Sequence, residues 1–214
     1  EYMTAPRESV ASIPESLDPV DAAPILCAGI TTYNALRNSG ARPGDTVAVQ
    51  GIGGLGHLGV QYSAESGYKT VAVSRGEDKR EMAEGLGADA YVDSGSEDPA
   101  DALSEMGGAD VILSTAPSAE AMESVIGGLG VDGDLIAVGV PEEGVSAPVQ
   151  RMIGARQSVS GWPSGQPSDS EDTLEFTALR DITPMTERYP LEEAPDAYDR
   201  MLSGDARFRV VLDV

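Results

Sequence analysis

The chain has 214 residues, of which 41% are hydrophobic, so it can form one substantial core, or one core with a small annex. Its 36 Asp and Glu against 14 Lys and Arg give a formal net charge of −22, which argues against nucleic-acid and anionic-membrane partners. Cys27 is the only cysteine, which excludes an internal disulfide, and no apolar run is long enough to cross a bilayer.

The acidic composition also predicts an environment. The acidic residues are scattered along the chain, and Lys69 and Lys79 are the only lysines. We therefore expect a cytoplasmic protein of a salt-adapted organism, because strong salt shortens the Debye length to about 3 Å and screens the self-repulsion. An ordinary acidic protein of a mesophile is the alternative.

The first 25 residues are rich in proline and contain one strand-like piece, at residues 10–13. They are too few to form a domain by themselves. The chain also opens without a Met and in the middle of a pattern. We expect it to be a fragment in which residues 1–25 are the remnant of a second domain.

The middle of the chain alternates between two patterns. Six short apolar runs are typical of strands buried on both faces, at residues 46–50, 70–74, 90–92, 110–114, 134–139 and 157–160. Helical patterns stand between them, at residues 58–66, 79–86, 100–106 and 119–129. This alternation predicts an α/β fold, with a doubly wound six-stranded parallel sheet of strand order 3-2-1-4-5-6 over residues 26–160.

The last part of the chain, residues 161–214, opens with a loop at 161–167. A helix at 172–179 and a strand at 182–187 are expected to follow, and then a helix at 191–202 and a strand at 207–212. We expect this segment to return to the second domain and complete it together with residues 1–25.

The most informative motif is TVAVQGIGGLGHLGV at residues 46–60, a strand, a glycine turn and a helix in succession. Gly51 allows a tight turn, Gly53 lets backbone N–H groups approach a diphosphate, and Gly56 allows close helix packing. The helix start adds unpaired N–H groups and a partial positive charge. The motif predicts dinucleotide binding in a Rossmann domain, with the diphosphate against Gly51, Gly53, Gly54, Leu55 and Gly56.

The end of the second predicted strand bears on which dinucleotide binds. An acidic residue there would bind the ribose 2′-hydroxyl of NAD, but this chain has Ser74, followed by Arg75 and then Lys79. A hydroxyl and two cations suit a 2′-phosphate, since Arg and Lys offer charge-assisted hydrogen bonds to its oxygens. The sequence therefore favours NADP over NAD.

The residues alone assemble no metal site. Zinc needs three or four protein ligands, and Cys27 and His57 are the only cysteine and histidine. His57 opens the helix after the glycine turn, where we expect at most a contact with the cofactor or with water near the diphosphate. A lone cysteine in an apolar stretch is usually part of the core.

Four segments, in order, resemble the zinc-dependent medium-chain alcohol dehydrogenases, and in particular the NADP-preferring aldehyde reductases and cinnamyl-type alcohol dehydrogenases. They are APILCAGITTYNAL, GDTVAVQGIGGLGHLGVQYS, AEGLGADAYVDS and YPLEEAPDAYDRMLSGDARFRVVLDV. The resemblance covers nearly the whole chain. It implies an enzyme that transfers hydride between NADP(H) and an alcohol or carbonyl compound, built from a Rossmann domain and a GroES-like catalytic domain.

The resemblance also implies roles for single residues. Cys27 matches one of three protein ligands of the catalytic zinc, and Thr31 matches a threonine against the nicotinamide. Arg209 matches an arginine that reaches the diphosphate. The backbone expected to meet the nicotinamide carboxamide is that of Thr115, Ala116, Val138, Gly139 and Val140. Members of the family commonly form homodimers or homotetramers.

The remaining zinc ligands of that family are absent from this chain. We therefore expect the 214-residue polypeptide to bind NADP(H) weakly and to catalyse no reaction. Two other interpretations stay open: a zinc-free quinone or enoyl reductase of the same superfamily, which Cys27 argues against, and a non-catalytic module that senses the dinucleotide.

Overall fold

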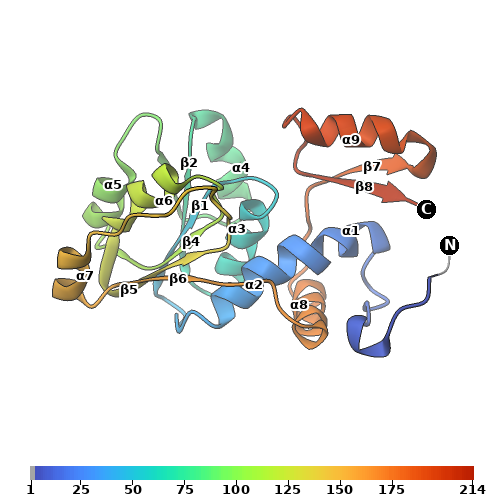
Figure 1. Ribbon diagram of the computed structural model, residues 1–214, viewed down its shortest axis with the longest axis horizontal. Helices are drawn as coiled ribbons and strands as arrows, with labels where there is room; N and C mark the ends of the chain where they lie inside the picture. Colours follow the sequence, from blue (N-terminus) through green and yellow to red (C-terminus); the bar gives the residue numbers. More distant parts are fainter. Residues whose placement is uncertain (1–2) are drawn as a thin grey trace.

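A computed structural model describes residues 3–214 (Figure 1). Its main layer is a parallel sheet of six strands in the order β3-β2-β1-β4-β5-β6. The strands are β1 (Thr46–Gln50), β2 (Lys69–Ser74), β3 (Ala90–Asp93), β4 (Ala109–Ser114), β5 (Leu129–Ala137) and β6 (Ser158–Gly161). The predicted α/β class, parallel sheet and strand order are confirmed.

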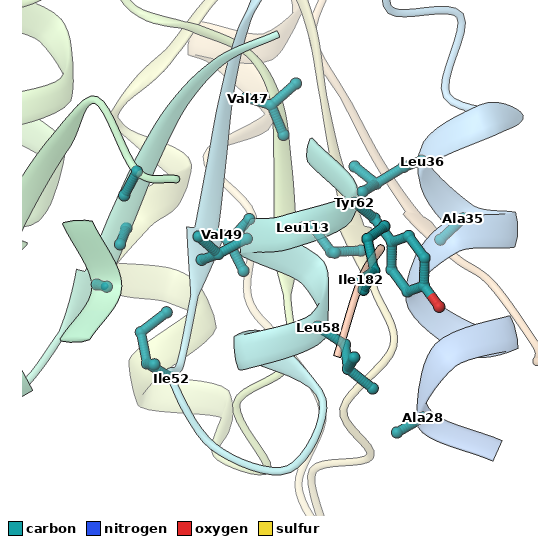
Figure 2. Packing of buried hydrophobic residues seen from close by; sticks show 14 of the residues in the cluster. Ala28, Ala35, Leu36, Val47, Val49, Ile52, Leu58, Tyr62, Leu113 and Ile182 are labelled. Atoms are coloured by element: carbon teal, nitrogen blue, oxygen red, sulfur yellow. The ribbon is translucent and has the colours of Figure 1, made fainter. Parts of the chain in front are cut away.

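Helices cover both faces of this sheet. One face packs against α2 (Ile30–Arg37), α3 (Gly56–Glu65) and α4 (Arg80–Gly85), and the other against α5 (Pro99–Glu105) and α6 (Ala119–Ile126). Burial on both faces explains the continuous apolar runs in the strands. Figure 2 shows the first of these cores, in which Tyr62 points from α3 toward α2, beside Ala35 and Leu36.

A smaller unit lies to one side of the sheet, as Figure 1 shows. It contains a parallel pair of strands, β7 (Thr186–Pro190) and β8 (Arg209–Asp213), with α9 (Ala194–Leu202) against them. Helix α1 (Pro19–Pro24) packs on the same strands, and Asp18 beside it pairs with Arg188 of β7 at 2.9 Å. The first and last parts of the chain therefore meet.

Helix α8 (Pro167–Leu179) connects the two parts. It begins five residues earlier than predicted, because Pro167 occupies its first position and Gln166 and Asp169 form a capping box. The Tyr33 ring of α2 stacks on Phe176 with ring centroids 4.7 Å apart, and the Tyr62 hydroxyl contacts the Thr177 hydroxyl at 2.7 Å.

None of the helices formed by residues 3–214 is long and apolar enough to span a membrane.

Two expectations about local structure are wrong, and one helix was not expected. Residues 10–13 form no strand, because no neighbouring strand pairs with them and the side chains of Val10 and Ile13 are exposed. The strand expected at 182–187 lies at Thr186–Pro190, where it pairs with β8. A helix that we did not predict, α7 (Val149–Ala155), has no buried residue.

Candidate functional site

A cavity of about 640 Å³ lies at the carboxyl ends of β1, β2 and β4. The strand order reverses between β1 and β4, and ligands of open α/β sheets bind beside such a switch point. The predicted cofactor residues that line the cavity are Gly51, Gly53, Gly54, Leu55, Ser74, Arg75, Lys79, Thr115 and Ala116.

The glycine turn forms the floor of this cavity. Gly51 has φ +87°, a conformation that L side chains rarely adopt, so glycine is required for the turn off β1. A Cβ at Gly53 would meet no atom within 4 Å, which leaves its backbone open to a ligand. Helix α3 starts here without a side-chain cap. The amides of His57 and Leu58 already donate to backbone carbonyl oxygens, so the N–H groups left for a ligand are those of residues 53–55, which line the cavity.

Gly56 is required for a different reason from the predicted one. A Cβ at Gly56 would lie 1.7 Å from the carbonyl oxygen of Gly51, so the residue lets α3 close on the turn itself. Gly59 is the glycine that lies against the sheet. A Cβ there would be 3.1 Å from Leu113 and 3.2 Å from Val49.

Hydroxyl and amide side chains hold the end of β1 to β4. The Thr115 hydroxyl lies 2.9 Å from the carbonyl oxygen of Gln50 and 2.8 Å from that of Gly51. The Ser114 hydroxyl donates to Gln50 Oε1 at 2.6 Å, and the Gln50 amide donates to the carbonyl of Ala121. We did not predict this network, which fixes the exit of β1 from across the switch point.

The cations predicted beside β2 lie at one end of the cavity. Lys79 Nζ donates to the carbonyl oxygen of Ile52 at 3.3 Å and to the Ser74 hydroxyl at 3.5 Å, while Arg75 is exposed. Asp93 of β3, which we did not predict to lie at the site, pairs in register with Ser74 of β2. Its Oδ1 accepts from the Gly76 and Gly95 amides at 2.6 and 2.9 Å, and these bonds lower the pKa of the carboxyl group.

Arg209 reaches the glycine turn from β8. A Cβ at Gly54 would lie 2.8 Å from Arg209 Nη1 and 3.2 Å from its Cδ, so the arginine side chain extends over this glycine. The sequence separates the two residues widely, and the structure brings them together.

The two segments predicted to meet the nicotinamide lie side by side. The Val138 and Gly139 amides both donate to the carbonyl oxygen of Ser114, at 2.9 and 3.1 Å. A Cβ at Gly139 would be 2.3 Å from the carbonyl oxygen of Ala116. Val138, Gly139 and Val140 do not line the cavity themselves, and Val140 is 84% exposed.

Cys27 and Thr31 lie on another element and do not line this cavity. Cys27 is exposed in a π-helical turn, Ile25–Gly29, and the Thr31 hydroxyl donates to its carbonyl oxygen at 2.7 Å. Among residues 3–214, no three His, Cys, Asp or Glu side chains come close enough to hold a metal ion. The described residues therefore do not fit a zinc site that needs three protein ligands.

His57 does not face the cavity, contrary to expectation. Its side chain is fully buried, with Nδ1 2.8 Å from the carbonyl oxygen of Gly53. Its Nε2 accepts from the Met185 amide at 3.1 Å. Both ring nitrogens are therefore bonded to the protein, and a contact with bound cofactor or water is not open to them.

Comparison with known proteins places this geometry in a family. Residues 54–178, more than half of the chain, match the family model described as zinc-binding dehydrogenase. An alcohol dehydrogenase (notN) of Aspergillus sp. strain MF297-2 is 44% identical over 99% of this chain and 62% of its own length. An alcohol dehydrogenase of Geobacillus stearothermophilus is 40% identical over 99% of this chain and 63% of its own.

Solved structures agree with these matches. The crystal structure of CAD from Helicobacter pylori, complexed with NADP(H), superposes with a TM-score of 0.80 at 29% identity, over 95% of this chain and 57% of that one. The chain thus spans about three fifths of the length of the relatives it matches. From its strand order, its glycine turn and these matches, the chain belongs to the zinc-binding dehydrogenase family.

Proposed function

We propose that this chain is the cofactor-binding part of an alcohol dehydrogenase that transfers hydride between NADP(H) and a small alcohol or carbonyl substrate. The observation that carries the proposal is the glycine turn. The open space above Gly53 and the backbone of residues 53–55 along the cavity would form a site for a diphosphate. The relatives named alcohol dehydrogenase and the NADP(H) complex of CAD support it.

The residues of the chain would bind and orient the cofactor. N–H groups of residues 53–55 would donate to diphosphate oxygens, and Arg209, which extends over Gly54, would neutralise part of their negative charge. The turn at Thr115 and Ala116, beside Gly139, would hold the nicotinamide end. When bound, NADPH supplies the hydride for carbonyl reduction, and NADP⁺ accepts it in alcohol oxidation.

The preference for NADP over NAD rests on the end of β2. Lys79 Nζ lies next to the Ser74 hydroxyl, and Arg75 is free to turn toward a ligand. Two cations and a hydroxyl favour a 2′-phosphate over an unmodified ribose. The Asp93 carboxylate lies nearby and keeps its negative charge, since the Gly95 and Gly76 amides stabilise its ionised form, but Lys79 and Arg75 together supply two positive charges.

Zinc enters the proposal only through Cys27. The thiol is exposed, and the described residues provide no partners for it. We therefore derive no catalytic step through a metal, and we expect no alcohol oxidation by the 214-residue polypeptide. A longer gene product containing these residues would have to be analysed for zinc, with and without Cys27→Ser.

Binding of the cofactor is the direct test. We expect NADPH to quench the fluorescence of Trp162, the only tryptophan, at lower concentrations than NADH. Lys79→Met should weaken NADPH binding about ten-fold, as expected for one charge-assisted contact. Lys69→Met is the matched control, because Lys69 is exposed at the start of β2, at the far end of the strand from Ser74. If calorimetry detects no binding of either dinucleotide to the unmodified chain, the proposal is wrong.

A further inference from the structure

The buried His57 side chain joins two parts of the chain that are distant in sequence. Its ring lies between the glycine turn, through Gly53, and the segment that enters β7, through Met185. Because the Met185 amide can only donate, Nε2 must carry the lone pair. The proton of the neutral ring is then on Nδ1 and is donated to the Gly53 carbonyl.

The surroundings of His57 keep the ring neutral. Burial is the main cause that lowers its pKa, to about 4, the Gly53 carbonyl opposes this, and the positive charge of Arg209 adds to the lowering. The Phe208 ring packs against the imidazole with centroids 5.1 Å apart. At neutral pH the imidazole therefore serves as one donor and one acceptor, which is the pairing that Gly53 and Met185 require.

The contact continues from Met185 to the arginine over the glycine turn. The carbonyl oxygen of Met185 accepts from the Phe208 and Arg209 amides, at 2.9 and 3.0 Å. The Arg209 side chain then returns over Gly54. The glycine turn therefore contacts Arg209 in two ways: directly through Gly54, and indirectly through His57 and Met185.

A second side chain of α3 holds the same segment. The Gln61 amide donates to the carbonyl oxygen of Thr183 at 3.1 Å, and the Thr183 amide donates to Gln61 Oε1 at 3.3 Å. Gln61 lies one helical turn after His57, so α3 is hydrogen-bonded to residues 183–185 through two of its side chains.

We propose that His57 is a positioning residue. It fixes the position of Arg209 relative to the glycine turn, so that both can contact the same diphosphate. The inference deepens the proposed function and rests on it. His57 touches no cofactor. It acts through Met185, and its loss would let β8 shift relative to α3 without opening the Rossmann core.

The test compares ligands with and without a diphosphate. His57→Phe keeps a ring of similar size but removes both hydrogen bonds, and His57→Gln retains one donor and one acceptor. We expect His57→Phe to weaken NADPH binding about ten-fold, as for loss of one contact to a charged group, and His57→Gln to restore part of the affinity. Binding of adenosine 2′-monophosphate, which has no diphosphate, should stay unchanged.

Two controls separate positioning from general destabilisation. Tyr62→Phe removes a buried hydrogen bond of the same helix, between the Tyr62 and Thr177 hydroxyls, and should leave the NADPH affinity unchanged. Arg209→Gln should weaken NADPH binding, and adding His57→Phe to it should cause no further loss. Fully additive losses, or an equal loss for adenosine 2′-monophosphate, would overturn the proposal.

Hydrogen exchange tests the same link without any cofactor. The Met185 amide should exchange faster in His57→Phe than in the unmodified chain or in Tyr62→Phe, because it loses its acceptor. Equal rates would overturn the role of His57 even if NADPH binds. Failure of the unmodified chain to bind NADPH would instead count against the proposed function.

Discussion

Alanine substitution at two glycines of the same turn should change the stability of the fold in opposite directions. At Gly53 an added Cβ meets nothing within 4 Å, and the residue does not have a positive φ. Gly53→Ala should therefore leave the fold intact, or stabilise it by about 0.4–1 kcal/mol through the unfolded state. The methyl group would, however, fill the space through which a diphosphate approaches the backbone.

At Gly56 the same methyl group has no room. Its Cβ would lie 1.7 Å from the Gly51 carbonyl oxygen and 2.8 Å from the carbonyl carbon, both backbone atoms that cannot rotate away. The turn or the start of α3 must then move by roughly 1 Å or more before the methyl group makes an ordinary contact. Overpacking of this kind costs about 1–3 kcal/mol, or roughly 2–12 °C in the melting temperature of a domain of this size.

Thermal unfolding and NADPH titration of both variants give the measurement. We expect Gly53→Ala to melt at or above the temperature of the unmodified chain and to bind NADPH about 10- to 100-fold more weakly, from the loss of a hydrogen bond to a charged group. Gly56→Ala should melt lower and lose binding as well. Unchanged NADPH affinity in Gly53→Ala would refute the assignment of the diphosphate to this turn.

Three further predictions concern specificity, pH and salt. Ser74→Asp should reverse the preference toward NADH, because a carboxylate repels a 2′-phosphate and accepts from a ribose hydroxyl; an unchanged ratio of the NADPH and NADH affinities contradicts the role of Ser74. The pKa of His57 is about 4 in the folded chain against an ordinary 6.5, so the unfolded state binds its proton more readily, and stability should fall by about 3 kcal/mol as the pH drops from 6.5 to 4. Urea unfolding of the unmodified chain and of His57→Gln, which has the same carboxylates, isolates this contribution; parallel pH dependences would argue against it. With a net charge of −22, the free energy of unfolding should rise between 0.1 and 1 M KCl as the Debye length falls from about 10 to about 3 Å, and a flat response in urea titrations would show that self-repulsion matters little.

Local patterns predicted the central sheet because burial leaves a direct trace in sequence. Strands covered on both faces read as apolar runs, and Gly51 marks the end of β1 because few other residues adopt its φ. The same reasoning failed where burial is absent. Residues 10–13 have an apolar pattern but no partner strand, and α7 forms although none of its side chains is buried.

The lining of the candidate site was predictable where one short segment supplies it. The turn at Gly51–Gly56 and the cations that follow β2 could be assigned from their spacing along the chain. The network of Gln50, Ser114 and Thr115 could not, because the predicted adjacency of β1 and β4 does not say which of their side chains meet.

By itself, then, the sequence determined where the strands and the glycine turn lie, since both follow from local periodicity and from backbone conformation. The alternation of strands with helices then predicted the doubly wound strand order. The tertiary structure decided which distant groups meet at the turn. It placed Arg209 over Gly54 and turned His57 away from the cavity to join Gly53 and Met185. No local signal predicts such pairs, because hydrogen-bond geometry is set by how packed elements approach one another in space.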